Sequence, residues 1–350
     1  MNVRFCASLG ALATAVVLLG VLPLAGQNQN PVDRADDWTM TYTPWGDPDL
    51  QGVYSFSTNT PLQRPETIAD RDNYTEEELA NLEASAAERI ANDVVSAREG
   101  TLGSSYNNFW TSNEKGALTG RTSLIIDPPD GRLPNVSERA QIIWEAQAAD
   151  RAERTIGEAP FTNLLYATWE DLPAYERCVA RPMPRVWQSY NHGAQILQTP
   201  GFVVIHYESM NDVRIIPVDG RPQLDDNIRQ WNGDSRGHWE GDTLVVEWTN
   251  FTDKQLFDGG RSGPPLNFPQ GNMTYVERIT RVDENTLNYE VTVDDPNIWA
   301  SSWTFAMPWR GGDPNYDQPE DLYEFACHEG NYRMIENTLK GSRALAAEDR

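Results

Sequence analysis

Apolar and polar positions alternate along most of the chain beyond about residue 187. The run 286–293 changes character at almost every step, whereas 202–207 is apolar except for His206, and both patterns are typical of β-strands with a buried face. Turn-forming residues separate these runs. The pattern predicts nine strands, at 194–198, 202–207, 213–217, 237–239, 243–248, 275–282, 286–293, 303–307 and 322–327.

The predicted fold is mainly β, and α+β over the whole chain, with an antiparallel barrel or a strongly curved sheet. A helical period occurs only before the strands. Thr75 to Glu78 has the form of a capping box and opens a helix to about residue 92, and Ser137 caps a second helix to about residue 154. We expect these two longer helices, N-terminal to the sheet, to pack around its outside or across one end.

The first 26 residues have the pattern of an export signal, with Arg4 before an apolar run at 9–24 and small residues at its end. An uncleaved anchor is the alternative. We expect a linker at 27–37, a single β-rich domain at 38–343 with a helical segment at 75–154, and a tail at 344–350. A Gly- and Pro-rich stretch at 257–272 is expected to form a loop that closes over a site like a lid, and 100–120 a second long loop.

Cysteine usage fits this interpretation. Cys6 lies in the signal, so Cys178 and Cys327 are the thiols left for an oxidising compartment, either secreted or periplasmic. We predict that they form a disulfide, which would contribute roughly 5 kcal/mol in the chain-entropy model. Two separate free thiols are the alternative.

Charge and composition restrict the partners. With 28 Lys and Arg against 52 Asp and Glu, the net charge of -24 repels phosphate backbones and anionic lipid, so we expect no nucleic acid and no membrane partner after signal cleavage. The 12 Trp and 13 Tyr fit either an aromatic core or a surface that stacks on a ligand. The oligomeric state is not determined by these features.

Familiar catalytic motifs are missing from the sequence. It contains no G-x-S-x-G, no H-E-x-x-H, no phosphate-binding glycine loop and no dinucleotide fingerprint. The four histidines are not at metal-ligand spacing from one another. We therefore predict no metal and no cofactor.

Two segments are rich in polar and aromatic groups. In 229–242, Asp234 and Arg236 either make structural hydrogen bonds beside tight turns or serve as a base and an anion stabiliser. Trp231 and Trp239 in that segment are candidate binding residues. In 327–332, His328 follows the predicted disulfide and is a candidate acid or base, or else a histidine that bonds backbone at a strand end.

The hairpin at 275–293 supplies further candidates. If Val282 lies opposite Leu287, Glu277 and Glu290 share one polar face, which either meets water or lines a lumen with the two carboxylates roughly 7 to 8 Å apart. Arg214 is a further candidate anion stabiliser. His206, inside an apolar strand, is expected in the core or lumen.

Several motifs together resemble a broad family of exported bacterial proteins, mostly described as hypothetical. They are Arg229 to Val246, Asn250 to Thr252, Glu277 to Asp283 and Tyr323 to Tyr332, and the resemblance implies no particular activity. The first strand, Gly52-Val53-Tyr54, is also similar to the opening strand of lipocalin-type barrels, which hold a small and often apolar molecule.

Two functions follow as hypotheses. The first is an exported enzyme, a lyase, isomerase or hydrolase, that performs acid–base chemistry on a small molecule in an aromatic-lined cavity. Its acid or base would be His328, its counterpart Asp234 or Glu277, and its anion stabiliser Arg236 or Arg214. The second is a non-catalytic lipocalin-like or carbohydrate-binding protein.

Overall fold

The computed structural model describes residues 38–99, 119–154, 166–185, 191–254, 270–311 and 322–348. The predicted signal at 1–26 and the linker at 27–37 lie outside these residues, as do most of the two long loops at 100–120 and 257–272. Among the described residues, no helix combines the length and the apolar character that crossing a bilayer requires.

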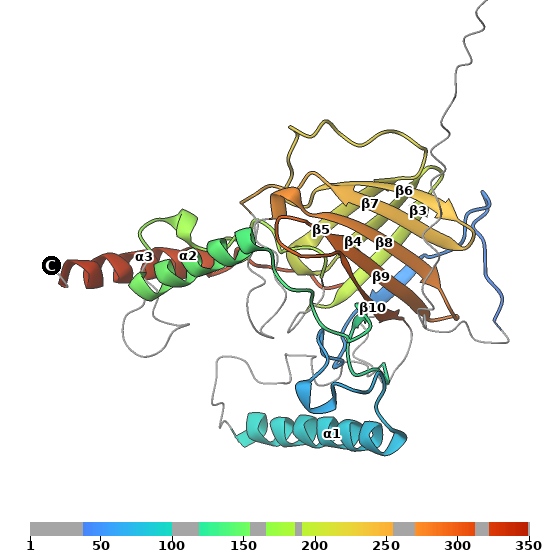
Figure 1. The fold of residues 1–350 in the computed structure, drawn as a ribbon, viewed down its shortest axis with the longest axis horizontal. Helices are drawn as coiled ribbons and strands as arrows, with labels where there is room; N and C mark the ends of the chain where they lie inside the picture. Colours follow the sequence, from blue (N-terminus) through green and yellow to red (C-terminus); the bar gives the residue numbers. More distant parts are fainter. Residues whose placement is uncertain are drawn as a thin grey trace, which may run out of the picture. The chain divides into compact units, whose positions relative to one another are not determined.

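One antiparallel sheet dominates the fold, as the alternating pattern predicts (Figure 1). Its strands follow the order β5-β4-β3-β1-β10-β9-β8-β7-β6, and β2 pairs with β10 beside this path. Most neighbours are joined by short hairpins, and β1 links the two series of hairpins through pairing with β3 and β10. The strands are β1 (Gly52–Ser55), β2 (Ile125–Asp127), β3 (Gly193–Thr199), β4 (Phe202–Tyr207), β5 (Asp212–Pro217), β6 (Asp234–Glu240), β7 (Thr243–Thr249), β8 (Thr274–Arg281), β9 (Thr286–Asp294) and β10 (Trp303–Arg310).

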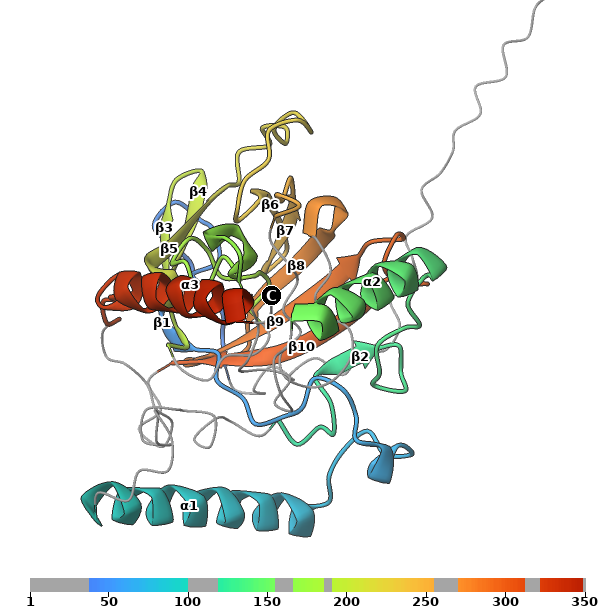
Figure 2. The same cartoon turned by 90° about the vertical axis from the view of Figure 1, so that its left-hand side faces the viewer.

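The sheet is not closed into a barrel, because no backbone ladder joins the end strands β5 and β6 within the described residues. The end strands nevertheless lie near each other, and we call the line where they approach the seam. Figure 2 shows the sheet turned so that β5 and β6 are both in view. Gly237 of β6 lies on the seam, where an added Cβ would stand 2.9 Å from Val218 and 3.0 Å from Ile216. A glycine is therefore needed for the ends of the sheet to approach this closely.

The register of the β8–β9 hairpin differs from the predicted one by one residue. Leu287 pairs with Arg281 instead of Val282, and Glu277 pairs with Val291. Since side chains alternate between faces, this shift places Glu277 on the buried face and Glu290 on the opposite face. The expected pair of neighbouring carboxylates is wrong for this reason.

Aromatic side chains fill the inner face of the sheet. Trp309 packs against Tyr289 with ring centroids 4.6 Å apart, and against Tyr207 at 6.1 Å. Trp248 and Trp303 are fully buried. Much of the aromatic surplus in the sequence is thus core, which burial of large rings stabilises.

Two helices begin at the predicted caps. Helix α1 (Glu76–Glu99) opens with the capping box of Thr75 and Glu78, and α2 (Glu138–Arg154) with the hydroxyl of Ser137 accepting from the Ala140 N–H. The first turns of α2 pack on the core, whereas the described side chains of α1 are mostly exposed. Of the two helices expected to pack around the sheet, α2 thus contacts the core, and the core cluster of the described residues contains no side chain of α1.

A third helix, α3 (Asn331–Glu348), was not predicted. It occupies most of the predicted tail at 344–350, and Ala, Leu, Glu, Lys and Arg give its second half high helix propensity. The strand predicted at 322–327 is absent: the side chain of Asn211 bonds both backbone groups of Phe325, in place of a neighbouring strand. The predicted disulfide between Cys178 and Cys327 is confirmed, with a Cα–Cα distance of 5.8 Å.

Candidate functional site

A buried ion pair lies on the inner face of the sheet at the seam. Arg214 of β5 and Glu277 of β8 form two parallel hydrogen bonds, Nη1 to Oε1 at 3.0 Å and Nη2 to Oε2 at 2.6 Å. Their side chains are 3% and 0% exposed. Strand alternation places both groups inward, next to Ile216 on β5 and Tyr275 and Ile279 on β8.

Four further side chains surround this pair, and with it they form what we call the interior cluster. Ser235 of β6 accepts from Arg214 at 3.1 Å, which makes a side-chain bridge across the seam. The hydroxyl of Tyr289 donates to Glu277, and that of Tyr207 accepts from Arg214 at 3.4 Å. The guanidinium of Arg214 also lies 3.6 Å from the ring centroid of Trp248.

The electrostatics of the interior cluster keep its tyrosines neutral. Burial raises the pKa of Tyr207, and it raises the pKa of Tyr289 well above the usual value, with the negative charge of Glu277 adding to both shifts. Burial alone would lower the pKa of Arg214, but the adjacent Glu277 outweighs it and the pKa rises. The cluster therefore holds a fixed ion pair and two protonated hydroxyl groups at neutral pH.

A second buried ion pair, formed by Arg185 and Asp212, lies next to the interior cluster, and we call it the seam pair. Asp212 is the first residue of β5, and it also accepts from Asn232 at 3.1 Å, just before β6. The guanidinium of Arg185 lies 4.8 Å from the ring centroid of Tyr207, which connects this seam pair to the interior cluster.

The attraction between Arg185 and Asp212 does not make up for the hydration that both charges lose on burial. Burial lowers the pKa of Arg185 to about 10 despite the attraction of Asp212. Burial likewise raises the pKa of Asp212 despite Arg185 and Asn232. Loss of hydration thus outweighs attraction on both sides of the pair, as expected when a buried charge lacks further hydrogen bonds.

Several buried polar atoms have no hydrogen-bond partner in the described part of the chain. Near the two pairs they include Nε and Nη1 of Arg185, Nε of Arg214 and Oδ1 of Asn232, all nearly inaccessible to solvent. Buried polar groups are nearly always bonded, so each of these atoms is an exception that calls for an explanation.

Contacts around the disulfide hold Arg185 in place. Cys178 lies in the segment that leads to Arg185, and Cys327 lies in the segment bonded to Asn211, directly before Asp212. Asn331, the first residue of α3, donates to the Glu176 carbonyl at 2.7 Å. The disulfide thereby links the segment of Arg185 to the segment that is hydrogen-bonded to Asn211, next to Asp212.

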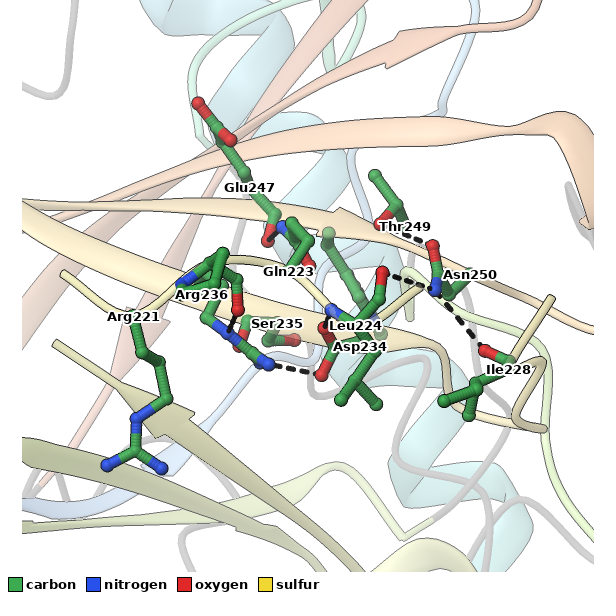
Figure 3. A network of polar contacts seen from close by, with 12 residues as sticks. Arg221, Gln223, Leu224, Ile228, Asp234, Ser235, Arg236, Glu247, Thr249 and Asn250 are labelled. Atoms are coloured by element: carbon green, nitrogen blue, oxygen red, sulfur yellow. Dashed lines mark hydrogen bonds and ion pairs between the residues drawn. The ribbon is translucent and has the colours of Figure 1, made fainter. Parts of the chain in front are cut away.

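Asp234 and Arg236 are placed differently (Figure 3). They lie on the outer face of β6, where Asp234 accepts from Arg236 at 2.6 Å and from the Leu224 N–H at 2.9 Å. Arg236 also donates to the Pro222 carbonyl at 2.7 Å. The contacts of this outer pair fit the structural alternative, because they fix the segment before β6 to the sheet.

The remaining predicted residues do not join one site. His328 is exposed on a turn before α3, His206 and Glu290 face outward on β4 and β9, and Trp231 is partly exposed before β6. Trp239 faces inward and packs against the core. Of the predicted candidates, the structure brings together Arg214 and Glu277, and it separates both from His328 and from the outer pair.

Sequence reasoning missed Arg185, Tyr207, Asp212, Asn232 and Tyr289. Tyr207 and Tyr289 could have been found from the sequence. Each lies two residues from an inward-facing apolar residue of the same strand, Ile205 or Val291, and therefore faces inward too. Arg185 lies outside the strands, so no periodicity marks it. In the described ranges, no group of three or more His, Cys, Asp or Glu is arranged to hold a metal ion.

Comparisons with known proteins give no family. No protein-family model matches the chain, and no curated protein matches it. Among solved structures, a secretary abundant heat soluble (SAHS) protein from Ramazzottius varieornatus matches at 12% identity with a TM-score of 0.23, covering 37% of this chain and 78% of that one.

Proposed function

We propose that this chain is an exported protein that binds a small molecule at the seam between β5 and β6. The observation that carries the proposal is the group of unpartnered buried polar atoms from Arg185, Arg214 and Asn232. They come from three separate segments: Arg185 and Asn232 both bond Asp212 at the start of β5, and Arg214 follows two residues later on that strand. A ligand that supplies acceptors and a donor there would complete the hydrogen bonding of the protein.

Energetics support a ligand at this place. A buried donor left without an acceptor costs about 1–3 kcal/mol, and more when it is charged. Arg185 carries two nitrogens of this kind with a side chain only 1% exposed. The ring of Tyr207, with Phe56 and Trp309 packed against it, lies beside this guanidinium and keeps its surroundings apolar.

Export is the part of the proposal that concerns location. The disulfide supports it, because such bonds persist mainly in oxidising compartments. The signal-like start of the sequence and the acidic net charge of -24 agree with a secreted or periplasmic protein.

A mixed ligand screen tests the binding proposal. The purified full chain, with its disulfide formed, would be tested by thermal shift against a panel of neutral, anionic and cationic small molecules. At least one compound should raise the unfolding midpoint saturably, and the effect should be lost in Asn232→Leu. Arg221→Gln, which changes an exposed arginine paired with Asp219, is the matched control. A panel without any saturable compound, or equal shifts in all three proteins, would contradict the proposal.

Acid–base catalysis is a second candidate, favoured by one observation: the Tyr289 hydroxyl donates to Glu277 beside Arg214. The hydrogen bond places a carboxylate where it can accept the proton of the hydroxyl group, which is the arrangement of a general base with its donor. The test is to incubate each compound that binds with the protein and to analyse it by mass spectrometry. Turnover that Tyr289→Phe abolishes while binding persists would support an enzyme, and unchanged compounds would leave only the binding protein.

A further inference from the structure

We infer that the outer face of β3, β4 and β5 is a surface on which two copies of this chain associate. The inference is independent of the binding proposed at the seam, because the side chains concerned point away from the inner face on which Arg214 lies. It depends on the exposure of this outer face, on its lack of charge, and on the way in which its central row would meet a copy of itself.

Large apolar side chains are exposed on this face. Ile215 is 61% exposed, Val213 53% and Leu197 45%. The strand register places Leu197 opposite Val204, and Val204 opposite Ile215, so that an apolar row crosses all three strands. Further outward side chains flank this central row, and together with it they form what we call the outer patch: Gln195, Leu197, Thr199, Phe202, Val204, His206, Val213 and Ile215.

The outer patch contains no Asp, Glu, Lys or Arg, although the net charge of the chain is -24. The outer face of β6 to β9 is different, since it holds ion pairs such as Arg278 with Glu240. Two acidic copies repel each other over most of their surface, and they do so least at a place without charges. A partner selected by its own charge would find no group to pair with on the patch. The charges therefore favour a second copy of the chain as the occupant.

The arrangement of the rows fits a two-fold axis. In a symmetric dimer each copy contributes the same surface, so the patch must be complementary to itself. Two sheets can stack face to face about an axis that passes close to Val204, either along the strands or across them. In both orientations the central row of one copy meets the central row of the other, because Leu197 and Ile215 lie on either side of Val204. Apolar side chains thus meet apolar side chains.

The size of the outer patch indicates a weak dimer. Three strands about 4.8 Å apart and about 20 Å long cover roughly 300 Å². Patches of this size are often functional on other proteins. A stable complex buries roughly 800 Å² on each partner, however. We therefore expect a reversible dimer that forms at high protein concentration.

Sedimentation velocity of the purified protein, with its disulfide formed, measures this equilibrium. Between about 1 µM and 1 mM, which spans the dissociation constants of weak dimers, the average mass should rise from that of one chain toward that of two. Ile215→Glu should raise the dissociation constant at least about tenfold, because a carboxylate would be buried between the copies. Ile142→Glu is the matched control: Ile142 lies on α2, it is 62% exposed, and the change of charge is the same. This control should associate as the wild type does.

Two further variants keep the test valid if Ile215→Glu disturbs folding. Ile215→Thr retains a β-branched side chain and adds no charge, so it should fold normally and still weaken association. Val204→Cys should be joined to a second copy by a short bismaleimide cross-linker, since this position lies close to the axis, whereas Ile142→Cys should not. A protein that stays monomeric up to about 1 mM would overturn the inference. Association that both Ile215 variants leave unchanged would also overturn it, as would equal weakening by Ile142→Glu.

Discussion

Two arginine–carboxylate pairs on opposite faces of the sheet show how differently the same residue types can act. Arg214 and Glu277 are buried on the inner face, 63 residues apart in sequence, and they join β5, β6 and β8. Asp234 and Arg236 are two residues apart on the outer face, where they bond to backbone groups of the preceding segment. The first pair connects distant strands, and the second fixes a local turn.

This difference bears on how polar motifs are interpreted. The segment 229–242 is rich in polar and aromatic groups, yet its charged pair makes local structural contacts. The polar groups of the interior come from strands in which charged residues are mixed with apolar ones. Local density of charged residues thus says less about a site than the meeting of inward positions from several strands.

The largest expected effect comes from breaking the inner pair. Glu277→Leu leaves Arg214 buried without its carboxylate, which should lower the free energy of unfolding by about 3–5 kcal/mol. Urea denaturation measures this loss. Replacing both residues, as Arg214→Met with Glu277→Leu, should restore much of the stability, since no unpaired charge then remains. A single variant as stable as the wild type would show that the interior is accessible to water.

The second largest effect is expected from alkaline pH, which should lower the free energy of unfolding through the buried tyrosines. Burial raises the pKa of Tyr54 to about 12, and it raises the pKa of Tyr207 and Tyr289. Above pH 10 the unfolded chain loses tyrosine protons that the native chain keeps, so the unfolded state binds fewer protons and stability falls as pH rises. The slope is about 1.4 kcal/mol per pH unit for each such tyrosine.

Urea unfolding between pH 9 and 11 tests this slope. Tyr289→Phe should make it shallower, whatever its effect on stability at neutral pH, because one buried hydroxyl fewer resists ionisation. Equal slopes in the two proteins would mean that Tyr289 titrates normally in the folded state.

Filling the seam should have an intermediate effect. Gly237→Ala places a Cβ within 3.0 Å of Val218 and Ile216, two β-branched side chains with little freedom to move. We expect a loss of about 1–3 kcal/mol from overpacking. Gly341→Ala in α3 is the control, since that Cβ meets nothing within 4 Å and should stabilise by about 0.5–1 kcal/mol. A seam variant that matched this control would show that the sheet ends separate freely.

The smallest effect is expected for the outer pair. Asp234→Asn keeps the shape and one acceptor for the Leu224 N–H but loses the charge that Arg236 pairs with, so the cost should be about 1 kcal/mol. Limited proteolysis between residues 221 and 230 should become faster. Ligand binding at the seam should not change, and a variant that lost binding while remaining folded would return the outer pair to the candidate site.

The sequence by itself determined the local elements of this protein. The structure contains eight of the nine strands predicted beyond residue 187, both helix starts and the disulfide. Strand patterns and helix caps depend on a few neighbouring residues, and the disulfide follows from having two cysteines outside the signal. The exception, at 322–327, depends on Asn211, which lies more than a hundred residues away.

Only the tertiary structure decided the site. The observed β8–β9 register differs by one residue from the predicted one. It places Glu277 on the inner face, opposite to the face of Glu290. The meeting of the two ends of the sheet brings Arg214 of β5 to Glu277 of β8. The disulfide links the segment of Arg185 to the segment bonded to Asn211, next to Asp212. Register and strand order are set by the packing of the whole sheet, so no local pattern in the sequence could reveal which polar groups would meet.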